Sequence, residues 1–520
     1  MEHDIIILGS GSAGAILATR LTEDPGNSVL LLEAGPDFTS FEQTPEEIRF
    51  AYGHDRNLWA RAFGRETKFG WEYTAKATEQ ADTMFVPRGK IIGGSSAVNA
   101  QIFLRGVPED YDNWAQMGND KWSFQELIPY FCKNEDDLDF QGWYHGNEGP
   151  IRVRRLRHED FIPEHRAFYN ACRAKGYPDC PDNNAPESTG VGPLALNNAD
   201  GIRWSTALGY LNQARHRSNL TIKANCLVLH IIFEGKKAVG VSVESRGEIF
   251  NVYGQKIIVC AGAIGSPHIL MLSGIGPADH LAEMDISVIQ DLPGVGQNLR
   301  DHPQVGVTLK AKEAFLTQGT EPRLQVGLRY TASDSNLRND MFILPASFAT
   351  NEGYYRISES PPVGFYIVAC LYLAAGAGEI KLSSSDPYQK PLLDYNYLAE
   401  PVDRKRLREA VRIIIDLTNH KAFEEIIAER ISPSDVHLAT DNSLDEWLMC
   451  QVSTSHHSSS TCKMGPKSDQ MAVVDQHGKV HGLEGLWVAD ASIMPDCVRA
   501  NTNATTMIIG ERISDFIRSV

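Results

Sequence analysis

The beginning of the chain alternates between apolar runs and a helix-compatible stretch. Residues 5–8 (IIIL) are continuously apolar, which suits a strand buried on both faces of a parallel sheet. Residues 15–21 are compatible with a helix, and residues 29–32 (VLLL) form a second apolar run. The order strand, helix, strand predicts a βαβ unit with two parallel strands.

Further elements follow from the same patterns. Residues 220–222, 228–233 and 239–243 alternate as strands should. A final helix is expected over residues 505–518. Another helix is expected over residues 403–418, because its apolar residues have helical spacing and form one packing face: Leu407, Ala410, Val411, Ile414 and Leu417.

A glycine-rich turn joins the first strand to the first helix. Residues 9–14 (GSGSAG) fit the pattern G-x-G-x-x-G. Gly9 permits the tight turn, Gly11 lets the backbone approach a pyrophosphate, and Gly14 lets helix and strand pack closely. Glu33, about 20 residues further on, ends the second strand and can accept hydrogen bonds from a ribose diol. These features predict dinucleotide binding, disfavour NADP, and leave FAD and NAD open.

Length and charge restrict the class of protein. The chain has 520 residues, and single cores stop growing near ~250–300 residues, so at least two domains are expected. A net charge of -17 disfavours nucleic acid and anionic membrane surfaces as partners. No stretch approaches the ~18 apolar residues of a membrane span, and no basic signal region begins the chain. Nine scattered cysteines without a CxxC pair indicate reduced thiols in the cytoplasm, and no metal-ligand spacing is found. The oligomeric state stays open.

Two internal motifs point to a family. Residues 89–99 (GKIIGGSSAVN), followed by Phe103, Gly106 and Asp112, resemble the first signature of the glucose–methanol–choline oxidoreductase family. Residues 262–267 (GAIGSP) and 273–276 (SGIG) resemble its second signature. The resemblance covers essentially the whole chain and implies that the dinucleotide is FAD.

The resemblance also implies the architecture. The expected fold is α/β (α+β), with a Rossmann-like FAD-binding domain interleaved with a substrate domain built on a mostly antiparallel sheet with helices. The FAD-binding domain would comprise residues 1–152, 192–302 and 451–520. The substrate domain would comprise residues 153–191 and 303–450, with Asp301-His302-Pro303 at the hinge.

The glycine motif and the resemblance together imply a set of FAD-binding residues. Val228 is similar to the residue whose backbone meets the adenine. Some relatives attach FAD covalently through a histidine of the first signature, but Val98 occupies that position here and cannot form the bond, so non-covalent FAD is expected. The expected FAD-binding residues are Gly9, Gly11, Ser12, Ala13, Gly14, Glu33, Ala34, Gly93, Ser95, Asn99, Ala100, Val228, Ala261, Asp490, Ala491, Asn501 and Thr502.

The catalytic pair is expected near the C-terminus. Residues 456–465 (HHSSSTCKMG) resemble the family segment H-P-x-G-T-C-x-M-G, which places the active-site base at His457, with His456 as the rival. Asn501 lies at the place of the second active-site residue. Alcohol oxidation removes a hydride, which flavin N5 accepts, and a hydroxyl proton, which suits a histidine with a pKa near neutrality. Asn501 would donate a hydrogen bond to the developing alkoxide.

The substrate is less well defined by the sequence. Choline-oxidising relatives hold the ammonium with a glutamate after the hinge His-Pro pair; Gln304 stands there and carries no charge, so choline is disfavoured. Aromatic residues of segment 37–83 suit either a lid or ordinary core packing. A small-molecule alcohol is the expected substrate, and O2 or a quinone or protein carrier the electron acceptor. The alternatives within the family are a hydroxynitrile lyase that keeps FAD without net redox and a flavin photodecarboxylase.

Overall fold

The N-terminal βαβ unit is present as the hydrophobic pattern predicts. The computed structural model describes residues 2–53, 55–316, 319–353 and 355–519. Strand β1 (Glu2–Leu8) leads through α1 (Gly14–Leu21) to β2 (Val29–Leu32), and the two strands pair in parallel. All four residues of β2 are buried, as expected of a strand with both faces covered.

Around this unit the chain forms a seven-stranded sheet. Its parallel strands are β8, β2, β1, β11 and β22, and an antiparallel hairpin of β10 and β9 extends it beyond β11. The three strands predicted from alternation are confirmed as β8, β9 and β10. The strands beyond the βαβ unit are β8 (Leu220–Lys223), β9 (Leu227–Glu234), β10 (Lys237–Ser245), β11 (Glu248–Val259) and β22 (Leu486–Val488).

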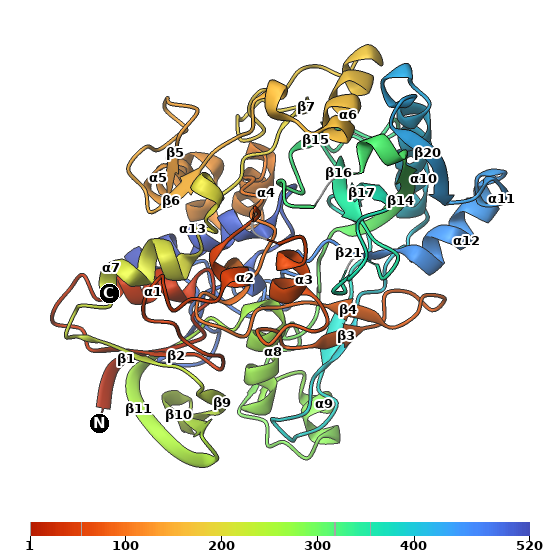
Figure 1. Cartoon of the computed structure of the whole chain (residues 1–520). Helices are drawn as coiled ribbons and strands as arrows, with labels where there is room; N and C mark the ends of the chain where they lie inside the picture. The colour runs from red at the N-terminus through yellow and green to blue at the C-terminus, as the bar shows by residue number, and fades with distance from the viewer. Residues whose placement is uncertain (1, 54, 317–318, 354, 520) are drawn as a thin grey trace.

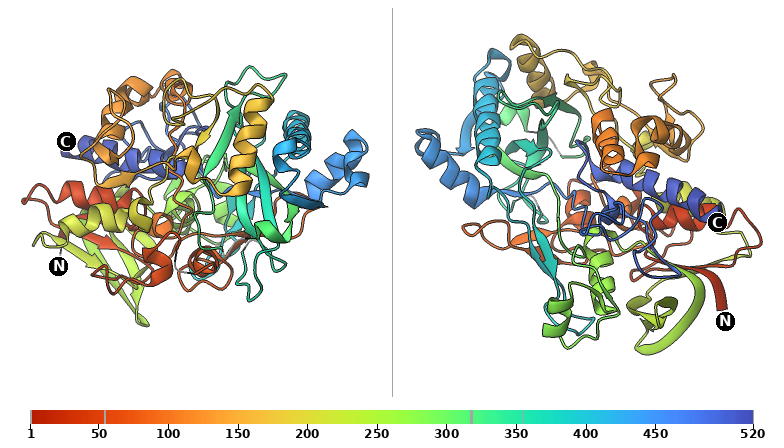
Figure 2. Two further views of the ribbon diagram at one scale, coloured as in Figure 1. Left: turned by 45° about the horizontal axis from the view of Figure 1, so that its top comes forward. Right: turned by 180° about the vertical axis from the view of Figure 1, so that it is seen from behind.

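The C-terminal helix packs on the first one. Helix α13 (Thr502–Arg518) begins three residues before the predicted start and lies beside α1, although the two are almost the whole chain apart (Figure 1; Figure 2). Arg20 of α1 forms a salt bridge with Glu511 of α13, whose side chain is fully buried. The two ends of the chain therefore form one layer against the parallel sheet.

A second seven-stranded sheet is antiparallel throughout and follows the order β20-β14-β17-β16-β15-β7, with β21 paired to β14. Helices α6 (Pro163–Ala174) and α10 (Pro401–Thr418) pack on it, and α10 confirms the helix expected over residues 403–418 (Figure 1). The strands are β7 (Gly190–Pro193), β14 (Pro303–Ala311), β15 (Val326–Tyr330), β16 (Met341–Ala349), β17 (Gly364–Leu371), β20 (Ile427–Ser432) and β21 (Ser453–Thr454).

Shorter elements surround the two sheets. The remaining helices are α2 (Glu46–Arg49), α3 (Leu58–Phe63), α4 (Pro108–Gln116), α5 (Phe124–Asn134), α7 (Asn212–Ala214), α8 (Gly262–Leu272), α9 (Ala278–Glu283), α11 (Asp435–Leu438) and α12 (Asp441–Gln451). The paired short strands are β3 (Tyr73–Ala75), β4 (Met84–Val86), β5 (Glu135–Asp137), β6 (Ile151–Val153), β12 (Ile275–Gly276), β13 (Gln290–Asp291), β18 (Glu379–Lys381) and β19 (Leu392–Asp394).

The two sheets support the expected mixed α/β architecture. We propose that residues 1–152, 192–302 and 451–520 form the cofactor domain and that residues 153–191 and 303–450 form the substrate domain. Strands β7 and β21 belong to the antiparallel sheet but reach past these boundaries. No helix in the described part of the chain is long and apolar enough to cross a membrane.

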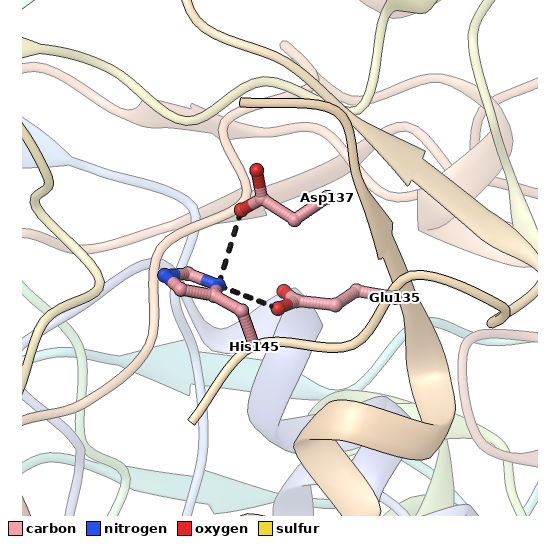
Figure 3. A group of neighbouring side chains, drawn as sticks. All are labelled: Glu135, Asp137 and His145. Atoms are coloured by element: carbon pink, nitrogen blue, oxygen red, sulfur yellow. Dashed lines mark hydrogen bonds and ion pairs between the residues drawn. The ribbon is translucent and has the colours of Figure 1, made fainter. Parts of the chain in front are cut away.

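A buried cluster of charges lies on β5 and the loop that follows it, outside both seven-stranded sheets. His145 Nδ1 lies 2.7 Å from Glu135 Oε1 and 3.1 Å from Asp137 Oδ2 (Figure 3). Its Nε2 lies 2.8 Å from Asp182 Oδ2. Because both nitrogens face carboxylates, both must carry a proton. Burial alone would lower the pKa of His145, but hydrogen bonds to Asp137, Asp182 and Glu135 outweigh burial and raise it to about 10.

Two arginines complete this cluster. Arg155 pairs with Asp137 at 2.9 Å and with Asp182 at 2.7 Å, and Arg105 pairs with Glu135. Three carboxylates are thus balanced by two guanidinium groups and one imidazolium. The acidic pair and the histidine would suit a metal ion by residue type, but their charges and the ring nitrogens are already engaged, and a structural role follows.

We predict that His145→Gln destabilises the protein by about 3–5 kcal/mol, because it leaves buried carboxylates without a cation. The control is His216→Gln at an exposed position, which should change stability by less than about 0.5 kcal/mol. Since the pKa of His145 is raised, its contribution is complete below its ordinary value and is lost as pH rises through about 10. Melting temperatures of wild type and variant should therefore converge above that pH, and a pH-independent gap would contradict the charged role.

Candidate functional site

A cavity of about 470 Å³ opens at the carboxyl ends of the parallel strands. Gly9 follows β1, Glu33 follows β2, and Cys260 follows β11, and all three residues line the cavity. Ligands of open parallel sheets bind at this edge, where the ends of neighbouring strands meet. Residues 455–458 and 501–503 form part of the cavity wall, so the two C-terminal motifs meet the N-terminal one here.

Three helices begin at this cavity. Ala13 precedes α1, Ala261 precedes α8 and Asn501 precedes α13, and each of these residues lines the cavity. The first turn of a helix has unpaired N–H groups and the positive end of the helix dipole. Three such ends at one cavity favour an anionic ligand such as a pyrophosphate.

The glycine motif leaves room for such a ligand. A Cβ atom on Gly11 would meet no atom within 4 Å, so its backbone is open to the cavity. A Cβ on Gly14 would lie 1.9 Å from the carbonyl oxygen of Gly9, so Gly14 permits close packing of α1 instead. Asn503 accepts a hydrogen bond from Ser12 at 2.7 Å, and its buried Nδ2 has no partner among the described residues. An open backbone, helix ends and a spare donor fit a dinucleotide.

The structure brings most of the predicted cofactor residues together. Gly14 and Gly93 do not line the cavity; they shape the turns beneath it. Glu33 is held at the cavity by Ser10 and by the backbone N–H of Gly35, at 2.6 and 2.9 Å. The predicted residues that line the cavity are Gly9, Gly11, Ser12, Ala13, Glu33, Ala34, Ser95, Asn99, Ala100, Val228, Ala261, Asp490, Ala491, Asn501 and Thr502.

His457 and Asn501 meet on the wall of the same cavity. Asn501 Nδ2 lies 2.9 Å from His457 Nε2, and the buried Oδ1 of Asn501 has no partner among the described residues. Burial lowers the pKa of His457 well below its ordinary value, and the nearby His302, His456 and Arg88 lower it further. The imidazole is therefore neutral at neutral pH and available to take a proton.

His456 also lines the cavity but points to other partners. The hydroxyl of Tyr355 lies 2.9 Å from its Nε2, and the ring of Phe63 meets it edge-on at 4.9 Å. Burial, with Arg88 nearby, lowers the pKa of His456 to about 3. Its Nδ1 has no partner in the described part of the chain. His456 is thus a neutral polar group within an aromatic wall.

Gln304 occupies a different place from the one expected. It does not line the cavity: its Nε2 donates to the Thr454 carbonyl at 3.0 Å, and its Oε1 accepts from Ser455 Oγ at 3.1 Å. Ser455 stands between Gln304 and the cavity. Gln304 thus contacts the cavity wall through Ser455.

Several wall residues are not singled out by sequence motifs. Four aromatic side chains of segment 37–83 line the cavity: Trp59, Phe63, Trp71 and Tyr73. Arg88 lines it as well and donates to Ser458 Oγ at 2.7 Å, a residue that replaces the proline of the family motif. Phe69 is buried away from the cavity against Phe38. The segment thus supplies one wall of the cavity and part of the core.

Fold and cavity together define a protein of the dinucleotide-binding class. The chain belongs to the GMC (glucose–methanol–choline) oxidoreductase family: the family's N-terminal model matches residues 3–304 and its C-terminal model residues 375–510. Its members bind FAD, and the protein is an FAD-dependent oxidoreductase that acts on CH–OH donors.

Individual relatives match over the full length. The chain is 38% identical to the oxygen-dependent choline dehydrogenase of Escherichia coli K12 over 100% of this chain and 96% of that protein. The structure of pyridoxine 4-oxidase from Mesorbium loti has a TM-score of 0.90 at 28% identity, covering 100% of both chains. A fungal aryl-alcohol oxidase shares the fold, with a TM-score of 0.84 at 22% identity and coverage of 100% and 99%.

Proposed function

We propose that the enzyme oxidises an uncharged alcohol to an aldehyde or ketone, with His457 as the base and Asn501 as its partner. The observation that supports this most directly is the 2.9 Å contact between His457 Nε2 and Asn501 Nδ2, on the wall of the cavity that the glycine motif also lines. FAD, when bound, supplies the hydride acceptor.

His457 is suited to take the hydroxyl proton. Its lowered pKa leaves the ring neutral at rest. Its Nε2 contacts Asn501, which lines the cavity. A general base has to be unprotonated and within hydrogen-bond reach of the proton that it removes. A hydroxyl that replaces the Asn501 amide at Nε2 would meet both conditions.

Asn501 is suited to hold the alcohol oxygen. Its amide nitrogen has two hydrogens, of which one is directed at His457, so the second can donate to the substrate oxygen. An amide does not compete for the proton, because it has no basic lone pair near neutral pH. It therefore stabilises the negative charge that develops on the oxygen as the proton leaves.

The charges around the histidines favour a substrate without a positive charge. The carboxylates that line the described cavity are Glu33, Glu72 and Asp490, and none of them bonds to His456 or His457. Arg88, which lines the cavity, bonds to Ser458, and its field reaches both histidines, whereas the carboxylate of Asp301 binds the backbone of His457 and does not line the cavity. A cation placed there would lose its hydration and meet a like charge.

Choline is the second candidate. The family relatives at 38% identity are choline dehydrogenases, and the aromatic wall formed by Trp59, Phe63, Trp71 and Tyr73 could attract a quaternary ammonium by cation–π contacts. The same wall packs equally well on a neutral ring, as the names of pyridoxine 4-oxidase and aryl-alcohol oxidase suggest for relatives. Because Arg88 on the cavity wall is positively charged, a neutral substrate is favoured over choline.

We further propose that the cofactor-binding residues named above hold FAD without a covalent bond. Val98 is buried and does not line the cavity, and its side chain has no atom that could attach to flavin. We expect electrons to pass on to O2 or to another acceptor in the cytoplasm.

The substrate class can be tested by mixing the holoenzyme anaerobically with a panel of alcohols. Neutral aryl, furanic and aliphatic alcohols should bleach the visible flavin absorbance, whereas choline at equal concentration should not. If choline alone bleaches the flavin, the substrate is a cation and the proposed neutral substrate is wrong. If no alcohol bleaches the flavin, the lyase or photodecarboxylase alternatives are favoured. Repeating the reaction in air separates an oxidase from a dehydrogenase.

His457→Ala should lower the rate constant of flavin reduction by about 10²–10⁴-fold, because proton transfer to a positioned base contributes that much. The absorption spectrum of bound flavin should be unchanged. His456→Ala is the matched control, since it removes the neighbouring cavity histidine; it should lose less than about 10²-fold. If His456→Ala is instead the inactive variant, the two histidines have the opposite roles.

Precipitation of the holoenzyme with acid should release all of the flavin into the supernatant, because no covalent bond holds it. The measurement is the flavin absorbance of the pellet and of the supernatant. A pellet that stays yellow after washing would show covalent attachment.

A further inference from the structure

A second histidine lies directly behind His457, on the side away from the cavity. His302 is fully buried, and its Nδ1 lies 2.9 Å from Nδ1 of His457. On the other side of its ring, Nε2 lies 2.9 Å from the carbonyl oxygen of Val498. His302 does not line the cavity, so it cannot touch a substrate there.

These contacts determine where the protons lie. A carbonyl oxygen only accepts, so His302 Nε2 must donate its proton to Val498. Burial lowers the pKa of His302 to about 3, so the ring is neutral and its Nδ1 is left with a lone pair. The short contact between the two Nδ1 atoms then requires His457 to carry its proton on Nδ1 and to donate it to His302.

We propose that His302 is a positioning residue that holds His457 in the Nδ1–H tautomer, so that Nε2, on the cavity side, is the unprotonated nitrogen. The inference rests on the proposed role of His457 as the base. The contact with Asn501 agrees with it, because the amide Nδ2 donates to an unprotonated Nε2. A chain of hydrogen bonds thus runs from the Val498 carbonyl through His302 and His457 to Asn501.

The surroundings keep both rings in place. Asp301 accepts hydrogen bonds from the backbone N–H groups of His302 and His457, at 2.7 and 2.8 Å. The ring of Tyr372 packs on His302 at 4.2 Å, and Cys497 Sγ lies 3.2 Å from His302 Nε2. The other charged or titratable groups whose fields reach the pair are Arg300 at His302 and Arg88 and His456 at His457.

The arrangement also prepares His457 for the product of proton transfer. After it takes a proton on Nε2, its Nδ1–H still donates to His302, so the imidazolium keeps a partner that is already placed. Without His302, the proton of the resting ring could move to Nε2 and pair with Asn501 Oδ1, which now has no partner. In that tautomer the base is blocked.

The tautomer can be observed directly in holoenzyme labelled with ¹⁵N-histidine, whose ring nitrogen shifts distinguish Nδ1–H from Nε2–H. The signal of His457 is assigned by its loss in His457→Gln. We expect the Nδ1–H tautomer in the wild type and the Nε2–H tautomer in His302→Phe. This readout needs no substrate, so it is independent of whether an alcohol is oxidised.

The kinetic test compares two substitutions of His302. His302→Phe keeps a ring but no acceptor, and should slow flavin reduction by about 10- to 100-fold, a part of the ~10²–10⁴-fold that a base contributes. His302→Asn keeps an acceptor near the position of Nδ1 and should recover most of that loss. The matched control is His165→Asn, which removes another fully buried neutral histidine in a place remote from the cavity.

Two results would overturn the proposal. One is an Nε2–H tautomer of His457 in the wild type. The other is a wild-type tautomer and rate in His302→Phe. If His302→Phe does not fold, the ¹⁵N shifts of His457 in the wild type and in His302→Asn still test the proposal. If no alcohol reduces the flavin while the tautomer is as expected, the proposed reaction fails and the assignment of His302 as the tautomer-fixing group stands.

Discussion

One buried carboxylate joins the antiparallel sheet to the active-site loop. Asp301, two residues before β14, accepts hydrogen bonds from the backbone of His302 and His457 at 2.7 and 2.8 Å, from the hydroxyl of Tyr397 at 2.7 Å, and from Thr454 of β21. These donors are spread over 155 residues of the chain, from His302 to His457. Because each would be left unsatisfied without the carboxylate, at a cost of about 1–3 kcal/mol apiece, the position of His457 depends on this one side chain.

The parts of the fold that depend on local pattern could be predicted from the sequence. The βαβ unit is defined by two apolar runs, a glycine turn and a helix, all within one short segment. Helix 401–418 has a clear apolar face, and helix 502–518 stands at the end of the sequence. The antiparallel sheet was expected only from the family resemblance. Its strands β15, β16 and β17 are almost continuously buried, so they show little alternation, and their pairing is set by contacts distant in the sequence.

The residues of the candidate site also divide into those that local motifs predicted and those that they did not. Motifs predicted many of the residues that line the cavity, because glycine turns and helix starts have local signatures. Gln304 was expected at the substrate but lies behind Ser455, since no residue of β14 lines the cavity. Arg88 and Asn503 line the cavity without being singled out, because only the fold brings the segment after β4 to Ser458 and the first turn of α13 to Ser12. His302 was expected only as part of a hinge, and its bond to His457 spans 155 residues.

The two histidine environments of this protein show why a neutral neighbour suits the base. His145 lies among three carboxylates, which raise its pKa to about 10 and keep it doubly protonated. Such a partner would orient the ring of His457 equally well, but it would also favour the proton that the base has to be free to accept. His302 orients His457 through a lone pair without adding negative charge, and burial then lowers the pKa of His457. A histidine acceptor therefore separates two effects that a carboxylate combines: it fixes which nitrogen holds the proton and leaves the other nitrogen empty.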